Sequence, residues 1–107
     1  RATSSKVVSR ADYIEGMQSI PVALSLADDA LYYENPDLQA SFELKNIEEI
    51  EYDDELATGK NLEHGSRALR LRSHGATFEF ILDPIDSQKW AALLPARRMG
   101  GTTARTA

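Results

Sequence analysis

The sequence predicts a small, mainly β domain: a barrel-like antiparallel sheet with one helix at its C-terminal end. Two segments, residues 20–35 and 67–83, alternate apolar with polar residues around a short turn and are typical of β-hairpins. After the second hairpin the apolar spacing becomes helical, and the only tryptophan lies in this helical segment. A terminal helix with a large aromatic side chain is one way of closing the open end of a curled sheet.

Length and composition indicate one ordinary globular domain. The 107 residues are 42% hydrophobic and 27% charged, and no apolar run approaches the roughly 20 residues of a membrane-spanning helix. The absence of cysteine excludes disulfides and thiolate metal sites and fits a reducing cytoplasm, the location we expect. Because the chain begins at Arg1, we interpret it as part of a longer protein.

The formal charge of −5 is unevenly distributed along the chain. Residues 28–55 contain eleven acids and one base, Lys45, whereas residues 60–72 contain four bases and one acid. The acidic stretch makes nucleic acid and anionic lipid poor partners. Opposite charges in neighbouring segments indicate that the two segments pair.

The N-terminal part predicts a strand and a hairpin. Residues 1–6 are expected to be a flexible lead, and residues 7–14 a strand, although their apolar spacing also suits a short helix. The first hairpin turns at Asp28 and Asp29, since short carboxylates tolerate turn dihedrals. Its register leaves Tyr32 on the outer face, as a candidate exposed contact residue. The expected pairs are Ala27 with Ala30, Leu26 with Leu31, Ser25 with Tyr32, and Leu24 with Tyr33.

Two further strands are expected after a break at residues 35–37, where proline and turn-forming residues end the hairpin. A long loop follows, and its role stays open because its apolar residues have no strand to join. These segments are residues 41–44 with Phe42 and Leu44 inward, residues 46–54 with Ile50 and Tyr52 inward, and the loop 54–66 with Leu56 and Leu62.

The last hairpin turns at His74 and Gly75, because glycine supplies the positive φ that a tight turn needs. If residues 46–54 lie beside this hairpin, Glu49 and Glu51 can face its arginines across the strands. The expected pairs are Arg72 with Thr77, Leu71 with Phe78, Arg70 with Glu79, and Leu69 with Phe80. The leucines and phenylalanines then form the core face, and Arg70, Arg72, Thr77 and Glu79 form the solvent face.

The helix follows Leu82, and Pro95 ends it. Either Asp83 or Asp86 can cap its N-terminus, with Pro84 in the first turn. Residues 96–107 have no periodicity and are expected to be a flexible tail. The core residues expected around the helix and last hairpin are Trp90, Leu93, Phe78 and Phe80.

In this order of elements, residues 7–95 resemble a pleckstrin-homology-like domain of the bacterial PH-like superfold. The most specific part of the likeness is the spacing from the last strand through Asp83 and Pro84 to Trp90 and the leucines at 93 and 94. The resemblance implies a partly open barrel of about seven antiparallel strands in two sheets, capped by the helix. Bacterial members also form symmetric oligomers, so the resemblance is consistent with self-association.

The lipid-binding residues of that family do not carry over. Its phosphoinositide-binding members cluster lysines and arginines on the first two strands and their loop, where several donors converge on phosphate. Here that loop contains Glu15 and no basic residue, and Lys6 and Arg10 are too few. We therefore expect neither phosphoinositide nor membrane binding.

Peptide-binding relatives in the same superfold add a strand to the edge of the fifth strand, beside the closing helix. The matching residues are 47–53, and Glu49, Glu51 and Asp53 form a candidate partner-binding edge for a basic extended segment. The alternative interpretation is that these charges only prevent unwanted strand pairing.

No constellation of residues predicts catalysis, a metal site or a cofactor. The cluster of residues 51–55 lacks the spaced ligands of a calcium loop, and His64 and His74 lie at turns without orienting carboxylates. We expect a non-catalytic interaction or assembly module that binds a protein, a peptide or another copy of itself. The alternatives are a weak lipid-headgroup or metal-dependent ligand-binding domain, or a small-barrel enzyme.

Overall fold

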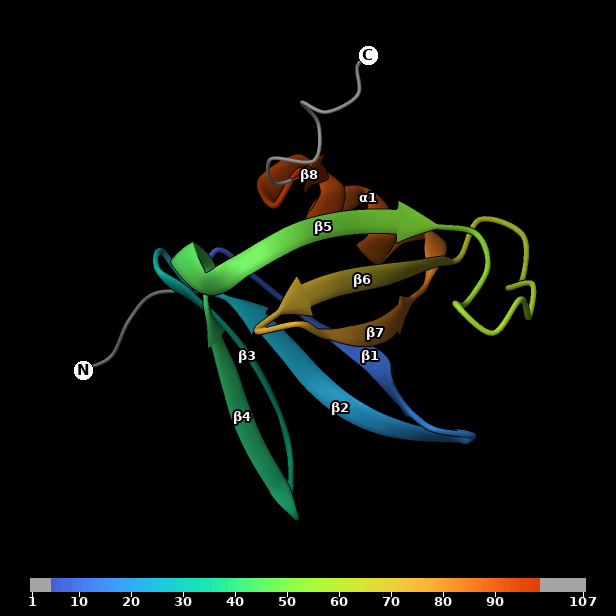
Figure 1. Ribbon diagram of the computed structural model, residues 1–107, viewed down its shortest axis with the longest axis horizontal. Coiled ribbons are helices and arrows are strands. Elements are labelled where there is room, and N and C mark those ends of the chain that lie inside the picture. Colours follow the sequence, from blue (N-terminus) through green and yellow to red (C-terminus); the bar gives the residue numbers. More distant parts are fainter. Residues whose placement is uncertain (1–4, 99–107) are drawn as a thin grey trace.

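The computed structural model describes residues 5–98 and shows an eight-stranded antiparallel sheet, curled into a half-barrel, with one helix across it (Figure 1). The strand order is β4-β3-β2-β1-β7-β6-β5-β8. The strands are β1 (Val7–Glu15), β2 (Gln18–Leu26), β3 (Ala30–Asn35), β4 (Leu38–Glu43), β5 (Ile47–Asp53), β6 (Arg67–Ser73), β7 (Ala76–Leu82) and β8 (Arg97–Arg98). A 3-10 turn, η1 (Leu44–Asn46), precedes β5, and the helix is α1 (Pro84–Leu93).

The mainly β fold with a C-terminal helix is confirmed. In place of two separate sheets, β1 pairs with β7 over three residue pairs and joins the two halves into one sheet. The eighth strand comes from Arg97 and Arg98, which the sequence analysis assigned to the tail. The rest of that tail, residues 99–107, and residues 1–4 of the expected lead lie outside the described residues.

Both predicted hairpin registers are confirmed. Leu26 pairs with Leu31 and Leu24 with Tyr33, and the second hairpin has all four expected pairs. The tight turn of the second hairpin has positive φ at both central residues, 52° at His74 and 79° at Gly75. The ambiguous first segment is a strand, because its alternation buries Val7 and Ala11 against β2.

Aromatic side chains fill the inside of the curl between strands that share no backbone hydrogen bonds. Phe42 of β4 meets Phe78 of β7 with ring centroids 4.8 Å apart, and Tyr33 of β3 meets Phe80 of β7 at 5.0 Å. Phe80 is fully buried, and burial raises the pKa of Tyr33 to about 12. Phe78 and Phe42 are partly buried at the margin of this core.

Helix α1 begins at an N-cap, where the Asp83 carboxylate accepts a hydrogen bond from the Asp86 backbone N–H at 2.8 Å. Trp90 is fully buried, as predicted, and its indole Nε1 donates to Ser9 Oγ of β1 at 2.9 Å. The assignment of Leu93 to the core was wrong, because its exposed fraction is 46%. Successive helical residues are about 100° apart, so the face that buries Trp90 and Leu94 turns Leu93 toward solvent.

Candidate binding edge at strand β5

Strand β5 lies near one edge of the sheet, beside the C-terminal end of α1 (Figure 1). The Tyr52 hydroxyl donates to the backbone carbonyl of Leu94 at 2.6 Å and so ties the end of the helix to β5. From there Pro95 and Ala96 lead the chain back to the outer edge of β5. The edge expected to accept an extended segment therefore lies at the exit of the closing helix.

The chain itself supplies a short segment on this edge. Arg97 pairs antiparallel with Ile50, and Arg98 with Glu49. Within the described residues, the remainder of β5 after Ile50 has no strand on this side. A groove of about 320 Å³ is lined by residues 49–52 of β5 and by residues 96–98.

One side chain anchors this segment to the turn before β5. The Arg97 Nη2 atom donates to the backbone carbonyl of Ile47 at 2.8 Å and to that of Leu44 at 3.0 Å. Both carbonyls belong to the turn η1 and its C-terminal cap. Because carbonyl oxygens only accept hydrogen bonds, this end of the edge favours a donor side chain.

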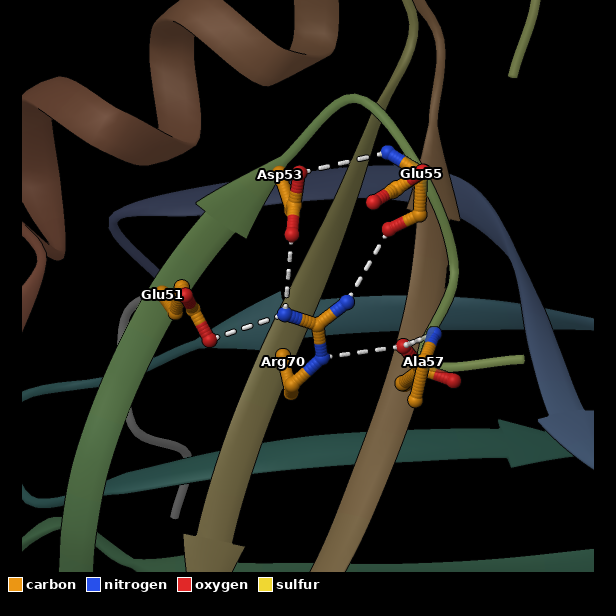
Figure 2. Close-up of polar contacts among 6 residues, drawn as sticks. Glu51, Asp53, Glu55, Ala57 and Arg70 are labelled. Atoms are coloured by element: carbon orange, nitrogen blue, oxygen red, sulfur yellow. Dashed lines mark hydrogen bonds and ion pairs between the residues drawn. The ribbon is translucent and has the colours of Figure 1, made fainter. Parts of the chain in front are cut away.

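The three acids of the predicted edge all lie on β5, but two of them already have an internal partner. Arg70 of β6 donates through Nη1 to Glu51 Oε1 at 2.8 Å and to Asp53 Oδ2 at 3.2 Å (Figure 2). Glu49 faces Arg72 across the β5–β6 pair, as expected, although the ion pair of Arg72 is with Glu48 at 3.5 Å. Of the predicted edge acids, only Glu49 pairs with a residue of β8, which is Arg98.

Arg70 also fixes the long loop 54–66. Its Nε donates to Glu79 Oε2 at 3.0 Å, and its Nη2 donates to the Glu55 carbonyl at 3.0 Å (Figure 2). The same Glu79 oxygen accepts the backbone N–H of Ala57 at 2.8 Å. The loop therefore crosses the outer face of β6 and β7, and Leu56 is its buried apolar residue.

The prediction that the outer face of the last hairpin is entirely solvent-exposed was wrong, because the loop 54–66 covers part of it. Arg72 and Thr77 are exposed, but Glu79 is buried with 7% exposure, and the Arg70 side chain is only 16% exposed. The expected alternation is right, yet the loop covers two of the four outward residues, Arg70 and Glu79. Leu56 was the sequence signal for this cover, since an apolar loop residue needs a surface to pack on.

The pKa values in the network follow from its hydrogen bonds. The hydrogen bond from Arg70 lowers the pKa of Asp53, and the backbone N–H of Glu55 acts in the same direction. Burial lowers the pKa of Arg70, but the bonds to Glu51, Glu79 and Asp53 outweigh it and raise the pKa overall. Burial also raises the pKa of the Tyr52 hydroxyl. The shifts of Asp53 and Arg70 therefore both favour the ionised form of the group.

The net charge of this region is negative despite the internal pairs. Five carboxylates surround two guanidinium groups on β5, β6 and β7, which leaves a formal charge of −3. The carboxylates belong to Glu48, Glu49, Glu51, Asp53 and Glu79, and the guanidinium groups to Arg70 and Arg72.

The other candidate contact residue lies elsewhere on the sheet. Tyr32 is 41% exposed, and it pairs with Ser25 on one side and Ser41 on the other, far along the sheet from β5. An open groove of about 1030 Å³ lies between the loop 54–66 and β1–β3. Its charged lining residues are two bases and four acids, a formal charge of −2, so it does not favour anions: Arg10, Lys60, Asp12, Glu34, Glu63 and Asp83.

Residues 5–98 contain no group of three or more histidine, cysteine, aspartate or glutamate side chains arranged to hold a metal ion. Asp53, from the acidic cluster considered at the sequence level, is held by Arg70. In the same part of the chain, no helix has the length and apolar character needed to cross a membrane.

Comparison of the chain with protein-family models, with curated proteins and with solved structures found no match. The resemblance to pleckstrin-homology-like domains therefore stays a prediction.

Proposed function

We propose that this domain is a non-catalytic interaction module, which binds an extended basic polypeptide segment as an added strand on the outer edge of β5. The single observation that carries the proposal is β8, a short basic strand that already pairs with this edge. Strand addition uses backbone hydrogen bonds for affinity, and the side chains along the edge provide selectivity.

Charge supports a basic partner. The β5 region has a formal charge of −3, whereas β8 contributes two arginines and no acid. Complementary charge raises association rates and suppresses wrong partners, while adding modestly to affinity. Half-buried carboxylates such as Glu49 therefore contribute selectivity for basic segments, while the backbone hydrogen bonds supply most of the affinity.

The edge has room for a longer segment than β8. Only Glu49 and Ile50 have partners in β8, and the groove continues along β5 to Tyr52. A segment of seven residues would pair with the whole of β5, and its basic side chains would lie near the acids of the outer face. A segment from another copy of the chain would bind by the same pairing.

The proposal is tested by titrating the full chain with a capped peptide of seven alternating threonine and arginine residues. Amide resonances are expected to shift at residues 47–53, at 97–98 and at the C-terminal end of α1. The matched control has glutamate in place of arginine and should leave these resonances unchanged. Shifts confined to β1–β4, or equal shifts with both peptides, would overturn the proposal.

Self-association has a separate measurement. Sedimentation equilibrium of the full chain reports its oligomeric state, and a second sample contains saturating arginine peptide. If other copies supply the bound segment, the peptide should reduce the average mass. An oligomer that the peptide leaves intact would assemble through a surface other than β5.

A further inference from the structure

Arg97 occupies the β5 edge in a way that resembles a bound ligand. Its backbone pairs with Ile50, and its guanidinium reaches the carbonyl oxygens of Leu44 and Ile47. A strand that only extended the sheet would not need these side-chain contacts. The neighbouring Arg98 makes no hydrogen bond or ion pair with its side chain within residues 5–98 and serves as the contrast.

We infer that the β5 edge is specific for arginine: a bound segment places one arginine in register with Ile50 and its guanidinium on the Leu44 and Ile47 carbonyls, and Arg97 is the chain's own occupant of that position. The inference rests on the proposed function and names the residue that the edge recognises. The partner is then an extended segment with an arginine at this register, and the chain's own arginine competes with it.

The acceptors explain the choice of residue. Two carbonyl oxygens lie 2.8 and 3.0 Å from a single Nη2 atom, and no carboxylate among the described residues is hydrogen-bonded to this guanidinium. A guanidinium is less strongly hydrated than an ammonium group, so it gives up less solvation when it binds neutral carbonyls. Its remaining N–H groups stay free for solvent. Lysine is therefore expected to be a weaker ligand at this position.

The competing segment is held weakly enough to be displaced. It contains only two paired residues, both exposed, and it follows Pro95 and Ala96 directly. A strand of two residues contributes few backbone hydrogen bonds, so the Arg97 side chain makes a large part of its attachment. When Arg97 occupies the site in most molecules, an added peptide can bind only the remaining fraction. The apparent affinity of the peptide is then lowered in proportion to that fraction. Removal of Arg97 should therefore expose the site to an added peptide.

The experiment compares the full chain with its Arg97→Ala and Arg98→Ala variants, each titrated with a capped peptide of six threonines around a central arginine. The Arg97→Ala variant should bind this peptide about tenfold more tightly than the original chain, and Arg98→Ala about as tightly as the original chain. Peptides with a central lysine or glutamine should bind Arg97→Ala at least about fivefold more weakly than the arginine peptide. Thermal unfolding of both variants checks that each remains folded.

Two results separate the inference from the proposed function. If the peptides shift the amide resonances of β5, but affinity depends neither on Arg97 nor on the central residue, the arginine site is wrong and strand addition stands. If no peptide perturbs β5 in any of the three chains, strand addition itself is wrong, and the arginine site fails with it.

Discussion

Arg70 shows how one side chain holds three parts of the molecule together. It joins β5 through Glu51 and Asp53, β7 through Glu79, and the loop 54–66 through the Glu55 carbonyl. Glu79 is buried, so its charge depends on this guanidinium and on the Ala57 backbone N–H. The Arg70 network therefore fixes the position of β5, the proposed binding edge, relative to β7 and the loop 54–66.

Replacement of Arg70 by methionine is expected to destabilise the domain by about 2–4 kcal/mol, because it leaves Glu79 as an uncompensated buried charge. Methionine keeps much of the apolar stem, so the loss reports the guanidinium. Arg72→Met is the matched control on the same strand and should cost less than about 1 kcal/mol, since Arg72 is exposed. Urea unfolding measures both changes, and equal losses would contradict the role given to Arg70.

Asp53 makes stability depend on pH in the acid range. Its hydrogen bond from Arg70 lowers its folded-state pKa below the value of about 3.9 in an unfolded chain. The stabilisation is therefore fully present above the unfolded pKa and is lost as the pH falls through the folded pKa. The difference in melting temperature between the original chain and Asp53→Asn should be largest near pH 6 and should shrink toward pH 2. A difference that is independent of pH would contradict this assignment.

Sequence patterns predicted single residues well where alternation alone decides their position, and less well where a distant segment intervenes. The outward position of Tyr32 follows from local register and is found. Glu51 was expected to face Arg70 only if residues 46–54 lay beside the last hairpin, and this pairing is found as well. The burial of Glu79 depends on a loop that starts 25 residues earlier in the chain, which no local pattern specifies. The contact of Arg97 with the Leu44 carbonyl joins residues 53 positions apart and was missed for the same reason.

At the scale of elements, the two hairpins and the helix are the parts that local sequence determines. A two-residue turn sets the register of each hairpin, and Asp83 and Pro84 set the start of α1. The pairing of β1 with β7 and of β5 with β8 depends on the curl of the whole sheet. Non-local pairs of this kind have no signature in a single segment.

Trp90 is the largest buried side chain of the closing helix. Trp90→Ala is expected to destabilise the domain by about 3–5 kcal/mol, because it removes a fully buried indole and leaves a cavity. Leu93→Ala, three residues later on the exposed side, should cost less than about 1 kcal/mol. Chemical unfolding of the two variants measures the contrast, and a large loss at Leu93 would contradict the orientation of α1.

The whole molecule is a curled sheet with two ends that differ in character. At one end β4 pairs only with β3 within residues 5–98, and at the other end β5 already has the short basic strand β8 (Figure 1). The β5 end combines acidic side chains, a groove and the exit of the closing helix. These features favour β5 over β4 as the binding edge, and β4 provides an internal control.

The most direct test is hydrogen exchange of the full chain with and without a saturating concentration of the arginine peptide. We predict slower exchange in the segment 47–53, because an added strand protects backbone amides of β5, and unchanged exchange in the segment 38–43 of β4. Slower exchange in β4 with β5 unchanged, or no change at either edge under saturation, would contradict the assignment of β5 as the binding edge.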